Sequence, residues 1–70
     1  MIRFAVCLAF PDGLRDVVVL ATHEGDAWRA WGALDAEGQR IPLTRIERAQ
    51  AEAAVAALVS QQADLFAKGA

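Results

Sequence analysis

The 70-residue chain has too little of several residue types to support whole classes of function. It contains one cysteine, Cys7, which excludes an internal disulfide, and a free thiol in an apolar segment is typical of a reducing compartment. It contains one histidine, His23, so the multi-ligand spacing of a zinc site is missing. No apolar run is longer than 53–59, far short of the roughly 20 residues that span a bilayer. We therefore predict a cytoplasmic protein that binds no metal and does not enter a membrane.

The chain also lacks an excess of basic charge. Its net charge of -2 and its pI near 5.1 provide no broad positive field for nucleic acid. Hydrophobic residues make up 56% of the sequence, above the roughly 45–50% of an average soluble domain. A chain of this size buries only about 60% of its unfolded surface. We therefore predict one domain, 1–70, with more apolar surface than its own interior can hide.

The first half of the sequence has the alternation of strands. From 2 to 10 every even position is apolar, and the odd positions hold an arginine and small residues, which is the period of a strand. Pro11-Asp12-Gly13 then provides turn chemistry, and 14–22 is rich in valine. We predict a hairpin here, followed by a second turn at 23–26.

The segment 27–34 fits two structures. Trp28 and Trp31 have helical spacing, and Asp26 is able to cap a short helix. The turn-like segment that follows, with Gly38 in a left-handed position, instead favours a third strand, which we prefer. A short fourth strand at 39–43 belongs at an edge of the sheet, because Pro42 has no amide hydrogen to donate.

The last third of the chain predicts one helix. Thr44 and Glu47 have the spacing of a capping box, and the helix is expected to run over about 45–67, with Gly69 beyond its end. One apolar stripe recurs at helical spacing: Ala51, Val55, Leu58, Val59, Leu65 and Phe66. The predicted fold is therefore α+β, a four-stranded antiparallel β-meander over about 2–43, in strand order 1-2-3-4, with the C-terminal helix on one face.

The faces of this sheet follow from its register, which we take to start with Phe10 opposite Leu14. The helix-covered face then holds Ile2, Phe4, Val6, Leu8, Phe10, Leu14, Val18, Leu20, Trp31, Ile41 and Leu43. The opposite face holds Ala5, Cys7, Ala9, Val17, Val19, Ala21, Trp28, Ala30 and Leu34, with Arg3, Arg15, His23 and Arg40 around it. Because no second helix remains to cover it, this face is expected to expose a contiguous apolar patch, which usually marks an interaction site.

Residues on this second face are the predicted partner contacts: Arg3, Arg15, Val17, Val19, Trp28, Leu34 and Arg40. An alternative is that the small side chains form ordinary scattered apolar surface. We also weigh a stacking and phosphate-contact surface for single-stranded nucleic acid, built from Trp28 and the arginines. The acidic composition disfavours binding of nucleic acid.

No catalytic or cofactor-binding residue is predicted. Cys7 and His23 resemble a nucleophile and its base, but the assumed register separates them by about 20 Å at ~3.3 Å per residue, and such a dyad needs hydrogen-bond contact. Cys7 is instead expected to be a small core or interface residue. His23, with Glu24 and Asp26, is a poor metal site.

The function predicted from the sequence is a non-catalytic protein–protein interaction module. It would act as a small adaptor, inhibitor or regulatory protein, through its uncovered sheet face or the edge of its first strand, and it would associate with itself. Inhibitors that phages or plasmids direct against a host machine are one population of this size and charge. The alternative is a dimeric nucleic-acid-binding regulatory protein that uses arginine and tryptophan side chains.

Overall fold

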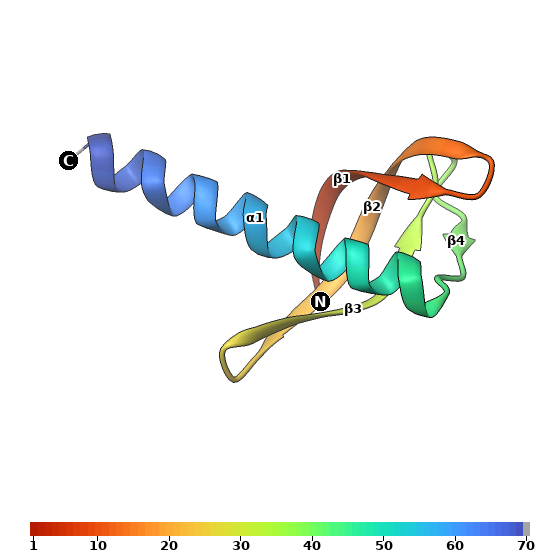
Figure 1. Cartoon of the computed structure of the whole chain (residues 1–70), viewed down its shortest axis with the longest axis horizontal. Helices are drawn as coiled ribbons and strands as arrows, with labels where there is room; N and C mark the ends of the chain where they lie inside the picture. The colour runs from red at the N-terminus through yellow and green to blue at the C-terminus, as the bar shows by residue number, and fades with distance from the viewer. Residues whose placement is uncertain (70) are drawn as a thin grey trace.

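One helix crosses one face of a twisted antiparallel sheet (Figure 1). The computed structural model describes the backbone of residues 1–69 and the side chains of residues 1–62. The elements are β1 (Ile2–Phe10), β2 (Gly13–Glu24), β3 (Ala27–Leu34), β4 (Arg40–Ile41) and α1 (Arg45–Gly69). The four-stranded sheet has the order β1-β2-β3-β4, which confirms the predicted α+β meander, the third strand and the short edge strand.

The loop between β3 and β4 is organised by Asp35. Its Oδ1 accepts hydrogen bonds from the backbone N–H groups of Glu37 at 3.0 Å and of Gln39 at 2.8 Å. The backbone N–H of Gly38 donates to the carbonyl of Asp35 at 2.9 Å, and Gly38 has a φ of 82°. Because glycine adopts this left-handed conformation without steric cost, the predicted turn is confirmed.

The helix begins with the predicted capping box. The Thr44 hydroxyl accepts from the backbone N–H of Glu47 at 3.4 Å, and the Glu47 carboxylate accepts from the N–H of Thr44 at 3.1 Å. Ala51 and Val55 are fully buried against the sheet. The helix extends to Gly69, and its C-terminal half projects past the sheet (Figure 1). The predicted stripe positions Leu65 and Phe66 lie outside the described side chains.

The register of the first hairpin differs from the prediction by one residue. Phe10 pairs with Gly13, so the loop consists of Pro11 and Asp12 alone. Gly13, with a φ of 130°, enters the ladder at once instead of lengthening the turn. A shift of one residue moves every side chain of a strand to the other face. In β2 the odd-numbered side chains therefore lie under the helix, and the even-numbered ones face away from it.

A second irregularity interrupts β3. Leu20 pairs with Gly32 whereas Ala21 pairs with Ala30, so Trp31 has no partner across the ladder. This β-bulge changes the alternation of β3. Ala30 and Ala33 are both buried on the helix side, and Trp31 is 45% exposed.

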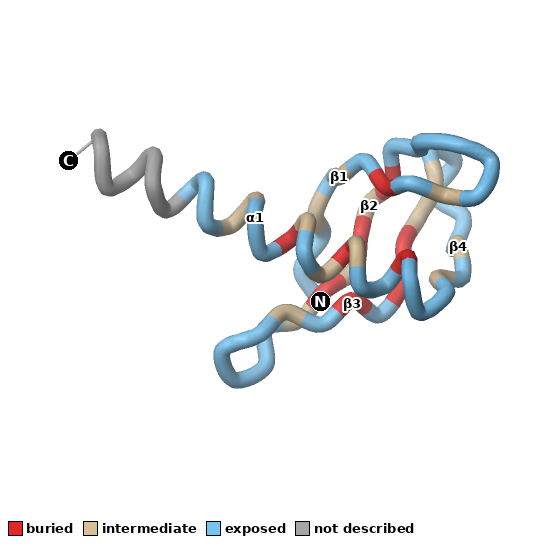
Figure 2. The backbone as a smooth tube through the Cα atoms, viewed as in Figure 1, coloured by how far each residue is buried: buried red, intermediate tan, exposed pale blue. Residues whose placement is uncertain are grey.

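The core lies between α1 and the centre of the sheet, where the buried segments of Figure 2 converge. Its members come from every long element: Leu8, Val17, Val19, Ala21, Ala30, Ala33, Ala51 and Val55. Larger side chains close its margins, namely Phe4, Val6, Phe10, Trp28, Ile41, Leu43 and Val59. Small residues in the centre of the sheet allow the helix to approach closely.

Two polar side chains of α1 bind backbone groups at opposite sides of the sheet. Gln50 Oε1 accepts from the N–H of Ala9 in β1 at 3.2 Å, and Gln50 Nε2 donates to the carbonyl of Ala9 at 3.4 Å. On the other side, a Glu52 oxygen accepts from the N–H of Ala30 in β3 at 2.9 Å. These bonds satisfy strand groups that the ladder with β2 leaves unpaired, and they fix the position of the helix.

Candidate interaction surface

The sheet face opposite α1 is the main candidate for an interaction surface, and we call it the uncovered face. No other element of residues 1–69 packs on it. Alternation from the observed register places the following side chains there: Arg3, Ala5, Cys7, Ala9, Leu14, Asp16, Val18, Leu20, Thr22, Glu24, Ala27, Arg29, Trp31, Leu34 and Arg40. Most of these are small or apolar, so the face is not the polar surface that a solvated sheet usually presents.

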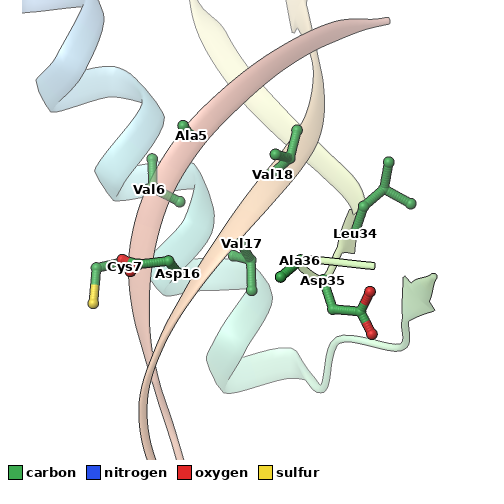
Figure 3. Close-up of a pocket in the computed structure, with 9 residues that line it drawn as sticks. All are labelled: Ala5, Val6, Cys7, Asp16, Val17, Val18, Leu34, Asp35 and Ala36. Atoms are coloured by element: carbon green, nitrogen blue, oxygen red, sulfur yellow. The ribbon is translucent and has the colours of Figure 1, made fainter. Parts of the chain in front are cut away.

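An apolar row crosses the middle of this face. Ala5 pairs with Val18, and Val18 pairs with Leu34, so these side chains from β1, β2 and β3 are adjacent. They form part of the lining of a shallow hollow of about 400 Å³ (Figure 3). The carboxylates of Asp16 and Asp35 also border the hollow. The row thus offers an apolar floor with an acidic rim.

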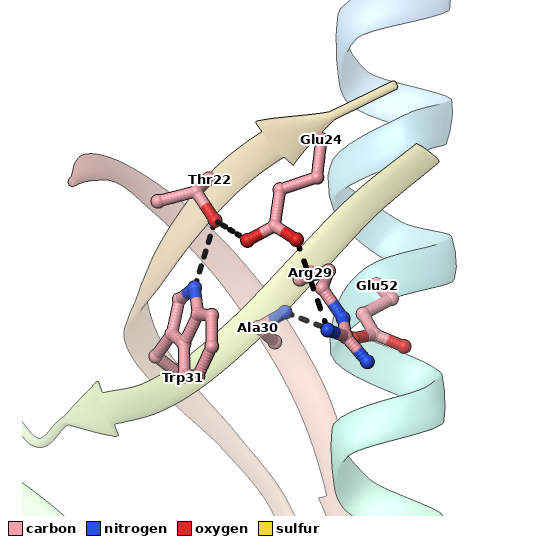
Figure 4. Close-up of polar contacts among 6 residues, drawn as sticks. All are labelled: Thr22, Glu24, Arg29, Ala30, Trp31 and Glu52. Carbon is pink, nitrogen blue, oxygen red and sulfur yellow. Dashed lines mark hydrogen bonds and ion pairs between the residues drawn. The ribbon is translucent and has the colours of Figure 1, made fainter. Parts of the chain in front are cut away.

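Trp31 lies on the same face in a fixed orientation (Figure 4). Its Nε1–H donates to the Thr22 hydroxyl at 2.7 Å, and that hydroxyl donates to Glu24 at 3.3 Å. The Arg29 guanidinium lies 5.9 Å from the centre of the indole ring and 3.7 Å from Glu24. An indole that is ordered by hydrogen bonds and still 45% exposed loses little rotational freedom when it binds a partner.

Arg40 covers the gap beside this tryptophan. Its Nε lies 3.4 Å from the position that a Cβ atom would occupy at Gly32. Gly32 therefore leaves room for the arginine side chain to lie across β3. The guanidinium contributes positive charge to a face whose floor is apolar.

The structure divides the residues that the sequence assigned to partner binding. Arg3, Leu34 and Arg40 lie on the uncovered face. Val17 and Val19 are only 3% and 0% exposed under α1, so the prediction that they lie on the uncovered face is wrong. The even-numbered residues of β2, Val18 and Leu20, take their place because of the one-residue register shift.

Arg15 and Trp28 are the other two corrections. The odd-numbered Arg15 is on the helix side of β2, where its guanidinium lies 5.4 Å from the centre of the Phe10 ring. Arg15 also bonds Asp12 at 2.6 Å. Trp28 is half-buried on the helix side, with its ring 5.2 Å from that of Phe4. The two tryptophans therefore lie on the faces opposite to those that the sequence predicted for them.

A second concave surface lies between β3 and α1, and we call it the basic groove. It has a volume of about 450 Å³. Its lining includes Arg29, Arg45 and Arg48 together with both tryptophans and Glu52. The sequence marks Trp28, Arg29 and Trp31 as neighbours, but it gave no sign of Arg45 and Arg48, because packing alone brings the first helical turns beside β3. The arginine and tryptophan surface predicted from Arg3, Arg15, Arg40 and Trp28 does not form, since these residues occupy different faces.

Cys7 and His23, the two residues that resemble a nucleophile and its base, lie on opposite faces of the sheet. Cys7 is exposed on the uncovered face, to which the sequence assigned it, so of the two expected roles the core residue is wrong and the interface residue stays a prediction. His23 is on the helix side of β2, where its ring lies 4.8 Å from that of Trp28. No group of three or more histidine, cysteine, aspartate or glutamate residues within the described part of the chain is placed to hold a metal ion.

The described helix is also not a membrane span, because it is not apolar enough over the required length. No protein-family model matches the chain, and neither the curated proteins nor the solved structures include a significant match. The uncovered face and the basic groove are therefore the features of the described residues that bear on function.

Proposed function

We propose that this protein is a non-catalytic protein-binding module, a small adaptor, inhibitor or regulatory protein whose contact surface is the uncovered face. The observation that carries the proposal is the apolar row of Ala5, Val18 and Leu34, which lies beside the exposed Trp31 on a face without a covering element in residues 1–69. Large exposed apolar patches on small proteins usually mark such sites.

The physical gain from covering this face is large enough to stabilise a complex. At ~25 cal/mol per Å², covering about 400 Å² of apolar surface contributes on the order of 10 kcal/mol before the costs of association. Tryptophan and arginine are the residue types that most often dominate the binding energy of an interface. Trp31 is the proposed anchor, and Arg3 and Arg40 lie at the periphery of the same face.

The test uses three baits that differ at one surface residue. The wild-type chain, Val18→Glu and Ile46→Glu are each immobilised, and the proteins that they retain from native cell extract are quantified. Val18 lies in the apolar row, whereas Ile46 is 72% exposed at the start of α1 and serves as the control for an added carboxylate. We expect a partner that wild type and Ile46→Glu retain and that Val18→Glu loses. Equal retention by three folded baits would place the contact elsewhere.

The predicted location and the predicted role as an inhibitor rest on composition alone. The cytoplasmic location rests on the single free cysteine, and the role as an inhibitor encoded by a phage or plasmid rests on small size and acidic charge. Each stays a prediction. Identification of the retained partner would test them directly.

The basic groove supports a second candidate, binding of single-stranded nucleic acid. Arg29, Arg45 and Arg48 line it together with Trp28 and Trp31, and proteins of that class pair cationic grooves with aromatic stacking platforms. The net charge of -2 argues against a strong general attraction. We therefore rank this function below protein binding.

Salt dependence distinguishes the two candidates. Phosphate contacts weaken steeply between about 50 and 200 mM salt, whereas an apolar interface does not. Fluorescence anisotropy of a labelled mixed-sequence oligonucleotide should show this loss, and Arg48→Ala should weaken binding where Arg15→Ala does not. Absence of binding at low salt would eliminate the second candidate.

A further inference from the structure

We infer that a second copy of this chain adds to the free edge of β1, so that two sheets join across a two-fold axis through Ala5. The inference deepens the proposed function, on which it rests for the role of the protein as an interaction module. It concerns a different surface, the strand edge, and therefore has its own test.

The edge of β1 has open backbone groups at defined positions. Because Phe10 and Gly13 flank the tight turn, the even-numbered residues of β1 exchange hydrogen bonds with β2, and the odd-numbered ones point away from it. The bonds from Gln50 to both backbone groups of Ala9 show that this odd-numbered residue faces outward. The N–H and carbonyl groups of Arg3, Ala5 and Cys7 therefore lie on the same outer edge. Within residues 1–69, no strand pairs with that edge.

The opposite edge of the sheet is far less suited to pairing. It is formed by the short β4, Arg40–Ile41, which is followed by Pro42 and pairs only with the last two residues of β3. Over the rest of β3, Glu52 of α1 already binds the N–H of Ala30. A proline has no amide hydrogen, and a strand this short offers few groups to a neighbour. Among the described strands, β1 thus has the longest edge without a partner strand, and Gln50 occupies only its Ala9.

Gln50 restricts the register of the added strand. In an antiparallel two-fold pair, each open odd-numbered residue must face another one. Centring the pair on Ala5 places each Arg3 opposite the second copy's Cys7, and all open groups are used. A shift toward the hairpin would require Ala9, whose backbone groups already bind Gln50. A shift toward the N-terminus would place Cys7 opposite Met1, which lies outside β1.

This register also brings opposite charges together. Within one copy, Cys7 pairs with Asp16. The proposed register adds the Arg3 of the second copy on the other side of Cys7, so the three side chains form one row on the uncovered face. At ~4.8 Å per strand, the outer two backbones are about 10 Å apart. A long arginine side chain spans that distance over the small cysteine and reaches the carboxylate.

Arg3 and Asp16 do not meet within one molecule. Arg3 pairs with Leu20, and the rows of Arg3 and Cys7 are separated by about 13 Å at ~3.3 Å per residue. Neither residue forms an ion pair with another described side chain. In the two-fold pair, Arg3 of each copy faces Asp16 of the other, so the dimer contains two such ion pairs.

The pairing joins the proposed contact surfaces of the two copies. Residues that face each other in a hydrogen-bonded pair project to the same side of the sheet. Both uncovered faces therefore adjoin at Ala5 and Cys7, and the apolar rows of the two copies become one continuous surface. A second copy thus doubles the area offered to a further partner.

The first test is a charge exchange followed by sedimentation of the full chain. Wild type should be a dimer, and Arg3→Glu and Asp16→Arg should each raise the dimer dissociation constant by about tenfold or more. The double variant Arg3→Glu/Asp16→Arg should recover most of the loss. Arg45→Glu changes the net charge as Arg3→Glu does, but at the first residue of α1, and should leave the dimer intact.

The second test locates the two-fold axis by crosslinking. A hydrogen-bonded antiparallel pair has a Cα separation of about 5.5 Å, within the range of a disulfide. Ala5→Cys in a Cys7→Ser background should therefore form a covalent dimer on mild oxidation. The wild-type Cys7 thiols, about 13 Å apart along the paired strands, should not.

The outcomes separate this inference from the proposed function. A monomeric wild type, a dimer insensitive to Arg3→Glu, or no recovery in the double variant would overturn the pairing of β1. If the wild type is monomeric and Val18→Glu still abolishes retention of a partner, the proposed function stands without the dimer. If the chain dimerises as described but retains no partner, the proposed function fails and the dimer remains.

Discussion

Gln50 binds both backbone groups of Ala9 and so takes the place of a neighbouring strand at one end of the β1 edge. The contact joins residues separated by most of the sheet and by the start of the helix. An unpaired edge is a template for association with other chains, and proteins commonly block part of it. In this chain the block is local, since it satisfies Ala9 and leaves the odd-numbered residues nearer the N-terminus open.

Replacing Gln50 by alanine should loosen the helix and this end of β1. We expect a loss of about 1 kcal/mol in the free energy of unfolding, the usual size for removal of a hydrogen-bonding side chain. Hydrogen exchange at the Ala9 amide should accelerate, as measured by NMR. Gln61→Ala, on the exposed part of α1, provides the control and should change neither quantity. Unaltered exchange at Ala9 in Gln50→Ala would mean that the amide is protected by another group.

The register of β2 predicts different costs for adjacent valines. Val19 is 0% exposed, whereas Val18 is half-buried on the uncovered face. Val19→Ala should lower the free energy of unfolding by about 2 kcal/mol, because it opens a cavity in the core. Val18→Ala should cost clearly less in the same urea titration. The reverse order would restore the register with Phe10 opposite Leu14.

The two tryptophans are expected to differ in their accessibility to solvent. Trp31 is 45% exposed, and Trp28 is half-buried against Phe4. Fluorescence of Trp28→Phe, which retains only Trp31, should be quenched strongly by acrylamide. Fluorescence of Trp31→Phe should be quenched less. Equal quenching in both variants would indicate that the bulge in β3 does not persist in solution.

Local signals in the sequence were sufficient for the architecture. Period-two alternation identified the strands, and the capping box of Thr44 and Glu47 identified the start of the helix. Each of these signals depends on residues close together in the chain. They give the type and order of the elements without the relative placement of their side chains.

The register of β2 against β1 could not be predicted from such local signals. The run 17–20 is apolar at both odd and even positions, so either face of β2 satisfies a core. Pro11-Asp12-Gly13 is compatible with closure at Gly13 or at the next residue. For the same reason the prediction of an apolar uncovered face holds although its residues changed, because Val18 and Leu20 replace Val17 and Val19.

The bulge in β3 and the hydrogen bonds from α1 to the strands had no signal in the sequence. Nothing in the residues around Trp31 marks it as unpaired, and the extra residue becomes evident only from the pairing of β2 with β3. Gln50 and Glu52 look like ordinary exposed helix positions. Their contacts with Ala9 and Ala30 depend on where the helix crosses the sheet. These long-range relationships determine the basic groove and the open part of the β1 edge.

The ion pair at the first turn predicts a pH effect that is confined to acid. The hydrogen bond from Arg15 to the Asp12 carboxylate, with the positive charge of the guanidinium, lowers the pKa of Asp12 below its ordinary value. A lowered folded-state pKa means that the contribution to stability is present above the unfolded pKa. It is lost as the pH falls through the lowered value. Both side chains are largely exposed, so the contribution is small.

NMR titration of the Asp12 carboxyl tests this directly. Arg15→Ala should raise the pKa of Asp12 toward the ordinary aspartate value, because both the hydrogen bond and the neighbouring charge are removed. Arg3→Ala removes one positive charge from the opposite face and should leave the pKa of Asp12 unchanged. An ordinary pKa for Asp12 in the wild type would show that Arg15 does not hold the turn in solution. Its guanidinium would then be free of Asp12, and its position over Phe10 would depend on the ring alone.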